Sequence, residues 1–73
     1  MSESLRLVSG REAVRKFERA GWTPVRQRGS HRMLTHPAYP WTLSIPDHPQ
    51  LGRGLLRKLI RQAGMTVDQF NAL

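Results

Sequence analysis

The sequence predicts an α+β fold, a two-layer sandwich in which helices cover one face of a three-stranded antiparallel sheet. Residues 41–45 alternate apolar and polar side chains, which is typical of a strand with one buried face. Residues 51–63 place apolar side chains at the spacing of an amphipathic helix. Two more strand-like runs and another helix come earlier, so the expected order is helix, three strands, helix and a short extra helix. Such an order leaves the second face of the sheet open.

The first helix is predicted to begin at Ser9, the N-cap of a capping box, because Glu12 follows three residues later. Gly21 stands where a helix needs a left-handed residue to end it. We expect Trp22 to pack the end of this helix onto the core. The apolar face of the helix is formed by Ala13, Val14, Phe17 and Ala20.

Three short strands are expected at residues 24–28, 31–36 and 41–45. Gly29 and Ser30 form the turn between the first two strands, and residues 37–40, which hold two prolines, form the second turn. Pro46 ends the third strand because proline cannot donate a hydrogen bond to the ladder.

The inward face of the second strand is less clear, because Met33 and Leu34 are adjacent apolar residues. Strand alternation groups His31 with Met33, and Arg32 with Leu34. We favour the arrangement in which Leu34 enters the core and His31 faces solvent. In the third strand, Trp41 is expected to belong to the buried face.

The second long helix is predicted over residues 51–63 and ends at Gly64. A last short helix begins at a second capping box, formed by Thr66 and Gln69, and ends near Leu73. The apolar stripe of the longer helix is formed by Leu55, Leu56, Leu59, Ile60 and Ala63.

With 73 residues, the chain is expected to form one domain, residues 1–73, too small to bury both a large core and a deep pocket. A shallow, exposed site is therefore expected. The formal net charge is +7, and ten of the twelve cationic residues are arginine, whose planar guanidinium matches phosphate oxygens in pairs. A genome rich in arginine codons is an alternative source of the arginines. The charge itself favours nucleic acid or an acidic protein as a partner.

The chain contains no cysteine, which excludes disulfides and thiolate metal sites. This fits a reducing cytoplasm, where we expect the protein to be located. The N-terminal residues lack the apolar core of a secretory signal peptide, and no apolar run approaches the roughly 20 residues that a membrane span needs. We expect no membrane partner.

The segment around the first strand turn holds the residues best suited to chemistry. His31 directly follows the turn, and histidine has an ordinary pKa of about 6.5, which allows proton exchange near neutral pH. Arg26, Arg28 and Arg32 flank it and would attract a polyanion. This combination suggests an RNA-cutting site. On these residues alone, an ordinary hydrogen-bonded turn histidine remains the favoured interpretation.

Several segments of the sequence form a recognisable set: residues 8–12, Gly21-Trp22, residues 28–31, His36-Pro37, residues 44–46 and residues 54–64. Together they cover nearly the whole chain and, in this order, resemble HicA-type toxins, the small ribonuclease half of HicA–HicB toxin–antitoxin pairs. Gly-Ser-His alone is a weak signal, but together with the Leu-Arg-x-x-x-Arg-Gln-Ala-Gly helix it is much more specific. Residues 39–41, Tyr-Pro-Trp, are more apolar than expected at that turn, which leaves the turn geometry open.

The resemblance implies a fold like that of double-stranded-RNA-binding domains, cleavage of messenger RNA, and a single catalytic histidine that falls on His31. It therefore shifts the interpretation of His31 from turn residue to catalyst. It also implies inhibition by a HicB-like antitoxin. The expected partners are messenger RNA and that antitoxin, and the free toxin is expected to be monomeric, with larger assemblies only in the antitoxin complex.

RNA supplies its own nucleophile, the 2′-hydroxyl beside the phosphate. The protein then has to move protons and stabilise the crowded phosphorane. We expect His31 to move the proton and arginines to stabilise the charge, without a metal ion or other cofactor. The product would be a 2′,3′-cyclic phosphate or its hydrolysed form.

Beyond His31, contacts with RNA are expected from residues near the turn and on the second long helix. Gly29 shapes the turn, and Ser30 is more often a turn cap than a phosphate ligand. Arg53, Arg57 and Arg61 recur every four residues, which suits a solvated helix face and a phosphate track about equally. The expected RNA-binding residues are Arg26, Arg28, Gly29, Ser30, Arg32, Arg57 and Arg61.

The other two histidines have weaker claims to a role. His36 precedes a proline and is interpreted as structural, while His48, in the loop before the second long helix, is a poorly supported second acid–base group. A metal site made of His31, His36 and His48 is not favoured, because no carboxylate is placed to orient the imidazoles.

Two other functions compete with RNA cleavage. A non-catalytic double-stranded-RNA-binding module would need the same fold and charge, and only the histidine at the turn separates the two hypotheses. The net positive charge also fits a protein that binds an acidic partner protein. This hypothesis does not exclude RNA cleavage, because a toxin must itself be inhibited by an antitoxin.

Overall fold

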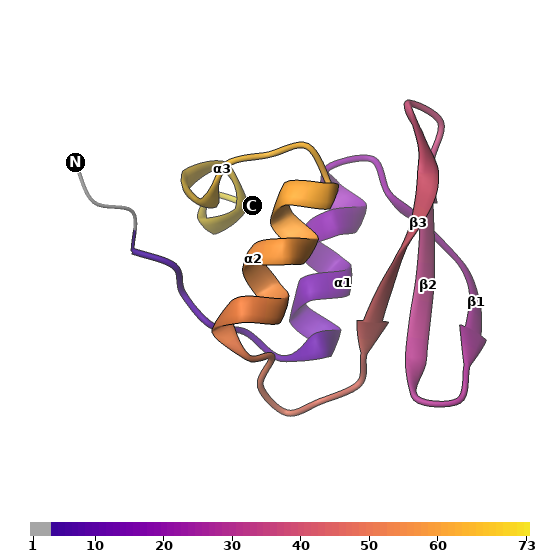
Figure 1. Cartoon of the computed structure of the whole chain (residues 1–73), viewed down its shortest axis with the longest axis horizontal. Coiled ribbons are helices and arrows are strands. Elements are labelled where there is room, and N and C mark those ends of the chain that lie inside the picture. Colours follow the sequence, from indigo (N-terminus) through magenta and orange to yellow (C-terminus); the bar gives the residue numbers. More distant parts are fainter. Residues whose placement is uncertain (1–3) are drawn as a thin grey trace.

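The computed structural model describes residues 4–73. Figure 1 shows two layers, with the strands in one layer and α1 and α2 on the same side of the sheet. No helix or strand of the described residues covers the opposite face of the sheet. The predicted α+β class and three-stranded antiparallel sheet are confirmed. The elements are α1 (Gly10–Arg19), β1 (Thr23–Arg28), β2 (His31–His36), β3 (Tyr39–Pro46), α2 (Arg53–Gln62) and α3 (Val67–Asn71).

The capping box predicted for the first helix is present at the start of α1. The backbone N–H of Glu12 donates to the Ser9 hydroxyl at 3.0 Å, and the Ser9 N–H donates to the Glu12 carboxylate at 3.1 Å. Gly21 has a φ of 98°, which glycine adopts without a steric cost. The face of α1 that packs on the sheet buries Ala13, Val14 and Phe17, while Ala20 is half-buried.

The sheet has the strand order β1-β2-β3 with both pairs antiparallel. β2 has the predicted bounds, and β1 begins one residue earlier than predicted, at Thr23. β3 begins at Tyr39 because Tyr39 pairs with His36, so the second turn contains only Pro37 and Ala38. The prediction of a turn over residues 37–40 is therefore wrong for residues 39–40, which belong to β3.

The core lies between the sheet and the helices. Leu34, Leu43 and Ile45 are fully buried from the sheet side, and Trp22 is buried at the end of α1, as predicted. Trp41 is 46% exposed, so its assignment to the core is wrong. It lies on the edge strand β3, where its indole N–H donates to the Gln62 carbonyl at the end of α2, at 2.8 Å. A hydrogen bond to a helix end holds this side chain at the rim of the core.

α2 begins at Arg53, two residues later than predicted. Leu51 precedes it, is fully buried, and donates its backbone N–H to the Val8 carbonyl at 2.8 Å. The helix starts only after Gly52, the N-cap, whose φ of −64° and ψ of 152° are extended rather than helical. Gly64, with a φ of 76°, follows the helix. α3 begins with the predicted capping box, in which the Gln69 N–H donates to the Thr66 hydroxyl at 3.1 Å.

No helix of residues 4–73 has the length and apolar character that crossing a membrane requires. The N-terminal expectations that concern residues 1–3 lie outside the described residues.

Candidate active site on the open sheet face

The turn between β1 and β2 is fixed from both sides. Gly29 has a φ of 59°, the left-handed conformation that the turn requires and that glycine tolerates. The Gln27 side chain donates to the Gly29 carbonyl at 3.0 Å, and the backbone N–H of Asp47 donates to the Ser30 carbonyl at 2.7 Å. The second bond ties the turn to the end of β3, so the backbone that carries His31 is held in place.

His31 lies on the open face of the sheet. Leu34 points into the core below the helices, so alternation along β2 places His31 and Met33 on the opposite side. The imidazole is exposed, and it lines a shallow depression of about 250 Å³ together with Arg28, Met33 and Ser44. The predictions that His31 faces solvent and Leu34 the core are confirmed. Met33 and Ser44 are not among the predicted site residues, although their ladder pairing puts them on this face.

Two of the flanking arginines share this face. Arg28 is the ladder partner of His31, and Arg26 is the partner of Met33, so both side chains belong to the open side of the sheet. Arg28 also lines the depression. The structure therefore brings together an exposed imidazole and two guanidinium groups, with no helix over them.

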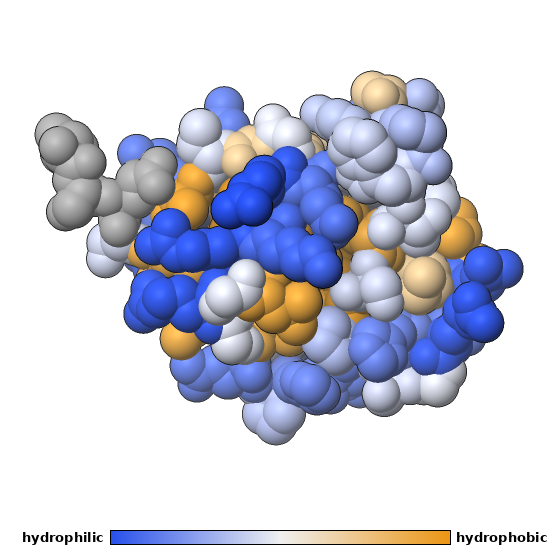
Figure 2. Space-filling model, viewed as in Figure 1, coloured by the Kyte–Doolittle hydropathy of each residue, from blue (hydrophilic) through white to orange (hydrophobic). Residues whose placement is uncertain are grey.

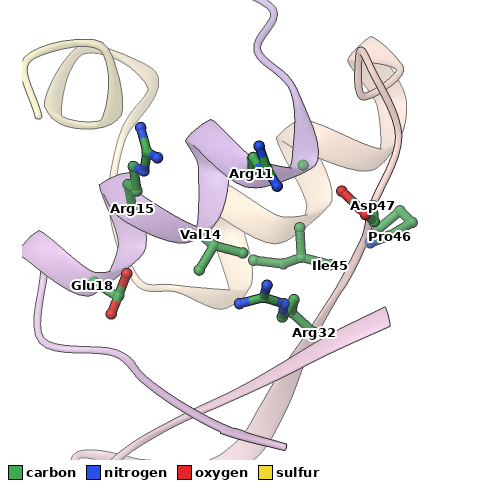
Figure 3. A pocket seen from close by; sticks show the side chains of 9 residues that line it. Arg11, Val14, Arg15, Glu18, Arg32, Ile45, Pro46 and Asp47 are labelled. Carbon is green, nitrogen blue, oxygen red and sulfur yellow. The ribbon is translucent and has the colours of Figure 1, made fainter. Parts of the chain in front are cut away.

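Arg32 lies on the other face. Its ladder partner is the buried Ile45, and it lines a cleft between the sheet and α1 (Figure 3). Strand alternation in the sequence groups Arg32 with Leu34, so the separation of Arg32 from His31 follows from the pattern.

Arg57 and Arg61 belong to the helical layer. They line a separate hollow together with Thr66 and Val67 at the start of α3. Figure 2 shows strongly hydrophilic residues gathered where Figure 1 places α2 and α3, and a second group at the edge of the sheet marked by β1. The structure does not bring Arg57 and Arg61 to the depression beside His31.

The other two histidines differ in their surroundings. His36 is half-buried, its Nδ1 accepts a hydrogen bond from the backbone N–H of Ala38 at 3.0 Å, and its ring packs against Trp22 and Tyr39. His48 is exposed, and its carbonyl accepts from the backbone N–H of Gly10 at 2.9 Å. Within the part of the chain that the structure describes, no three His, Asp or Glu side chains gather as a metal site would require.

Residues 10–65 match the family described as HicA toxin of bacterial toxin–antitoxin systems. The chain belongs to the HicA toxin family. The matched region runs from the start of α1 to the residue before the α3 capping box, and it includes the whole sheet and His31. A HicA protein is the toxin of a toxin–antitoxin pair, which implies an antitoxin partner. No curated protein matches the chain.

Proposed function

We propose that this HicA-family chain is an endoribonuclease that cleaves messenger RNA without a metal ion, with His31 as the catalytic residue. One observation carries the proposal: an exposed imidazole stands on the uncovered face of the sheet beside the guanidinium-bearing Arg28. We further propose that residues 1–73 act as one domain in the cytoplasm, and that the free toxin is monomeric.

In the proposed reaction, the 2′-oxygen of a ribose bonds to the adjacent phosphorus while the bond from phosphorus to the 5′-oxygen breaks. The neutral imidazole of His31 accepts the proton of the 2′-hydroxyl, and the resulting imidazolium returns a proton to the leaving 5′-oxygen. The products are a 2′,3′-cyclic phosphate and a 5′-hydroxyl. The open depression suits this chemistry, because a flexible RNA strand can reach it without entering an enclosed pocket.

Arginines stabilise the charge that builds up on the phosphorane. Arg28 is the nearest candidate, because it is the ladder partner of His31 and lines the same depression. Arg26 extends the positive surface along the same face of β1. Gly29 and Ser30 set the backbone of the turn, while Arg32, Arg57 and Arg61 contact the RNA away from the reacting phosphate.

A HicB-like antitoxin would neutralise this chain by covering the open face. The net charge of +7 favours an acidic inhibitor, and the sheet face around His31 is accessible to a protein as well as to RNA. An adjacent reading frame that encodes a small acidic protein would support the pairing, and a strongly basic neighbour would contradict it.

Product analysis tests the reaction. Purified protein is incubated in chelator with an end-labelled transcript and with the same sequence made of 2′-deoxynucleotides, and identically purified His31→Ala protein controls for contaminating nuclease. We expect cleavage of the RNA only, with cyclic phosphate and 5′-hydroxyl ends. Cleavage of the deoxy strand, or activity that requires added Mg²⁺, would contradict the mechanism.

The second candidate is a non-catalytic double-stranded-RNA-binding module. The position of Arg57 and Arg61 on the helical layer favours it, because such modules meet the RNA backbone over a broad surface rather than at one phosphate. In the same assay, RNA that is shifted in a gel but remains intact would favour this module over the nuclease.

A further inference from the structure

A cleft of about 370 Å³ lies between α1 and the helix-side face of the sheet. Figure 3 shows Arg11 on the helix wall and Arg32 on the sheet wall, with Arg15 extending from the rim. The floor is formed by Val14 and Ile45, which are almost fully buried and offer a ligand little apolar surface. A ligand in this cleft would therefore meet mainly charged groups.

The charges of the cleft favour an anion. Three guanidinium groups and the carboxylates of Glu18 and Asp47 line it, so its charged side chains sum to +1. In Figure 3 the two carboxylates stand at opposite ends, and the guanidinium of Arg32 lies apart from both. The side chain of Arg32 is thus left available to a phosphate, which a guanidinium binds through paired hydrogen bonds.

The cleft is adjacent to the proposed catalytic residue through the backbone. Arg32 follows His31 directly in β2, and Pro46, the ladder partner of His31, lines the cleft. Only the end of the sheet separates the imidazole from the cleft, at the place where Asp47 is bonded to Ser30. A polynucleotide that leaves the depression and passes over this edge would enter the cleft.

The size of the cleft limits what can bind. A volume of about 370 Å³ is near the lower end of the range of roughly 300 to 1,000 Å³ that is typical of small-molecule pockets. It accommodates a phosphate with its attached nucleoside, and it is too small for a duplex.

We propose that this cleft is a second RNA subsite, in which Arg11 and Arg32 bind a backbone phosphate of the strand whose cleavage site lies at His31, while Arg15 adds positive charge at the rim. The inference rests on the proposed function, since it needs a chain that binds RNA. It assigns a role to two arginines of α1 that lie outside the apolar face of that helix.

Binding of a single-stranded 2′-O-methyl RNA, which lacks the nucleophile, tests the subsite without cleavage. Arg11→Gln and Arg32→Gln should each weaken binding about tenfold and reduce the slope of log affinity against log salt by about 0.7. Glu18→Gln should strengthen binding by a few-fold. Arg19→Gln removes an exposed charge from the same helix outside the cleft and should leave the slope nearly unchanged. Melting temperatures establish that each variant is folded.

Cleft variants that bind the RNA as tightly as Arg19→Gln, with the same salt slope, would overturn the inference. So would saturation of the cleft by micromolar inorganic phosphate, which would identify a free anion as the ligand. A wild-type protein that binds no RNA overturns both proposals. If the wild type cleaves nothing but the cleft variants lose affinity, the nuclease proposal fails and the subsite remains.

Discussion

At Gly10 the backbone of α1 meets the backbone at the end of β3. A Cβ there would overlap the carbonyl oxygen of Pro46 and lie 3.2 Å from the Cα of Asp47. Neither backbone group can rotate away, so Gly10→Ala should lower the free energy of unfolding by about 1–3 kcal/mol. Urea denaturation measures the change. Gly54→Ala in α2 is the matched control, because a Cβ there meets nothing within 4 Å and should be neutral or stabilising.

Glu12 links stability to pH. Hydrogen bonding with the backbone N–H and the hydroxyl of Ser9, helped by the positive charges of Lys16 and Arg15, lowers the pKa of Glu12 from its ordinary value of 4.5. A carboxyl group whose pKa is lower in the folded than in the unfolded state stabilises the protein at pH values above its unfolded-state pKa. This stabilisation is lost as the pH falls through the folded-state pKa.

The urea midpoint should therefore fall between about pH 5 and pH 3, and it should fall less in Glu12→Gln, which keeps the capping geometry without the titrating carboxyl. If the urea midpoints of the wild type and Glu12→Gln fell in parallel as the pH is lowered, the Glu12 carboxylate would not contribute to the pH dependence of stability.

Individual residues show where sequence patterns stop being informative. Alternation groups His31 with Met33 and Arg32 with Leu34 but does not choose the inward face. The arrangement favoured from the sequence, with Leu34 in the core and His31 in solvent, is the one found. The same alternation places Trp41 in the core, and fails. Leu43 and Ile45 of the same strand are fully buried, whereas Trp41 lies beside the last residue of α2, whose carbonyl accepts from the indole N–H, and stays 46% exposed. Which part of a strand a helix covers depends on tertiary packing.

At the scale of elements, helix starts are predictable where a capping box marks them. Ser9 and Thr66 begin their helices as expected, since their side chains bond the third residue of the helix. α2 has no such signal: its N-cap is Gly52, which makes no side-chain bond, and the apolar residue Leu51 belongs to a backbone contact with Val8. That contact joins segments distant in sequence, so local pattern alone does not show it.

Arg53, Arg57 and Arg61 form a row of arginines along α2, of which Arg57 and Arg61 are expected to contact RNA. If Arg57 and Arg61 bind phosphates, the double variant Arg57→Gln/Arg61→Gln should reduce the salt slope for single-stranded RNA by about 1.4. Filter binding at several salt concentrations measures it. Lys58→Gln, an exposed charge on the same helix, is the control. An unchanged slope in the double variant would identify the row as a solvated helix face.

In the molecule as a whole, the fold separates the imidazole of His31, the proposed catalytic group, from most of the positive charge. The imidazole, Arg26 and Arg28 occupy the open sheet face, while Arg57 and Arg61 lie on the helical layer and Arg32 on the helix-side face of the sheet. The small size of the chain predicts a shallow, exposed site, and the depression at His31 has this character. Chain size and composition do not predict the cleft beneath α1, because its walls come from α1 and from the strands β2 and β3, which meet only in the folded protein.

In the proposed reaction, the imidazole of His31 moves the proton that RNA cleavage requires. The most direct test is the single-turnover cleavage rate at saturating RNA and in chelator, compared between the wild type and His31→Ala. We predict a fall of about 10²- to 10⁴-fold with RNA affinity little changed, which is the usual contribution of a general acid–base group. A folded His31→Ala protein that cleaves RNA at the wild-type rate would contradict the account.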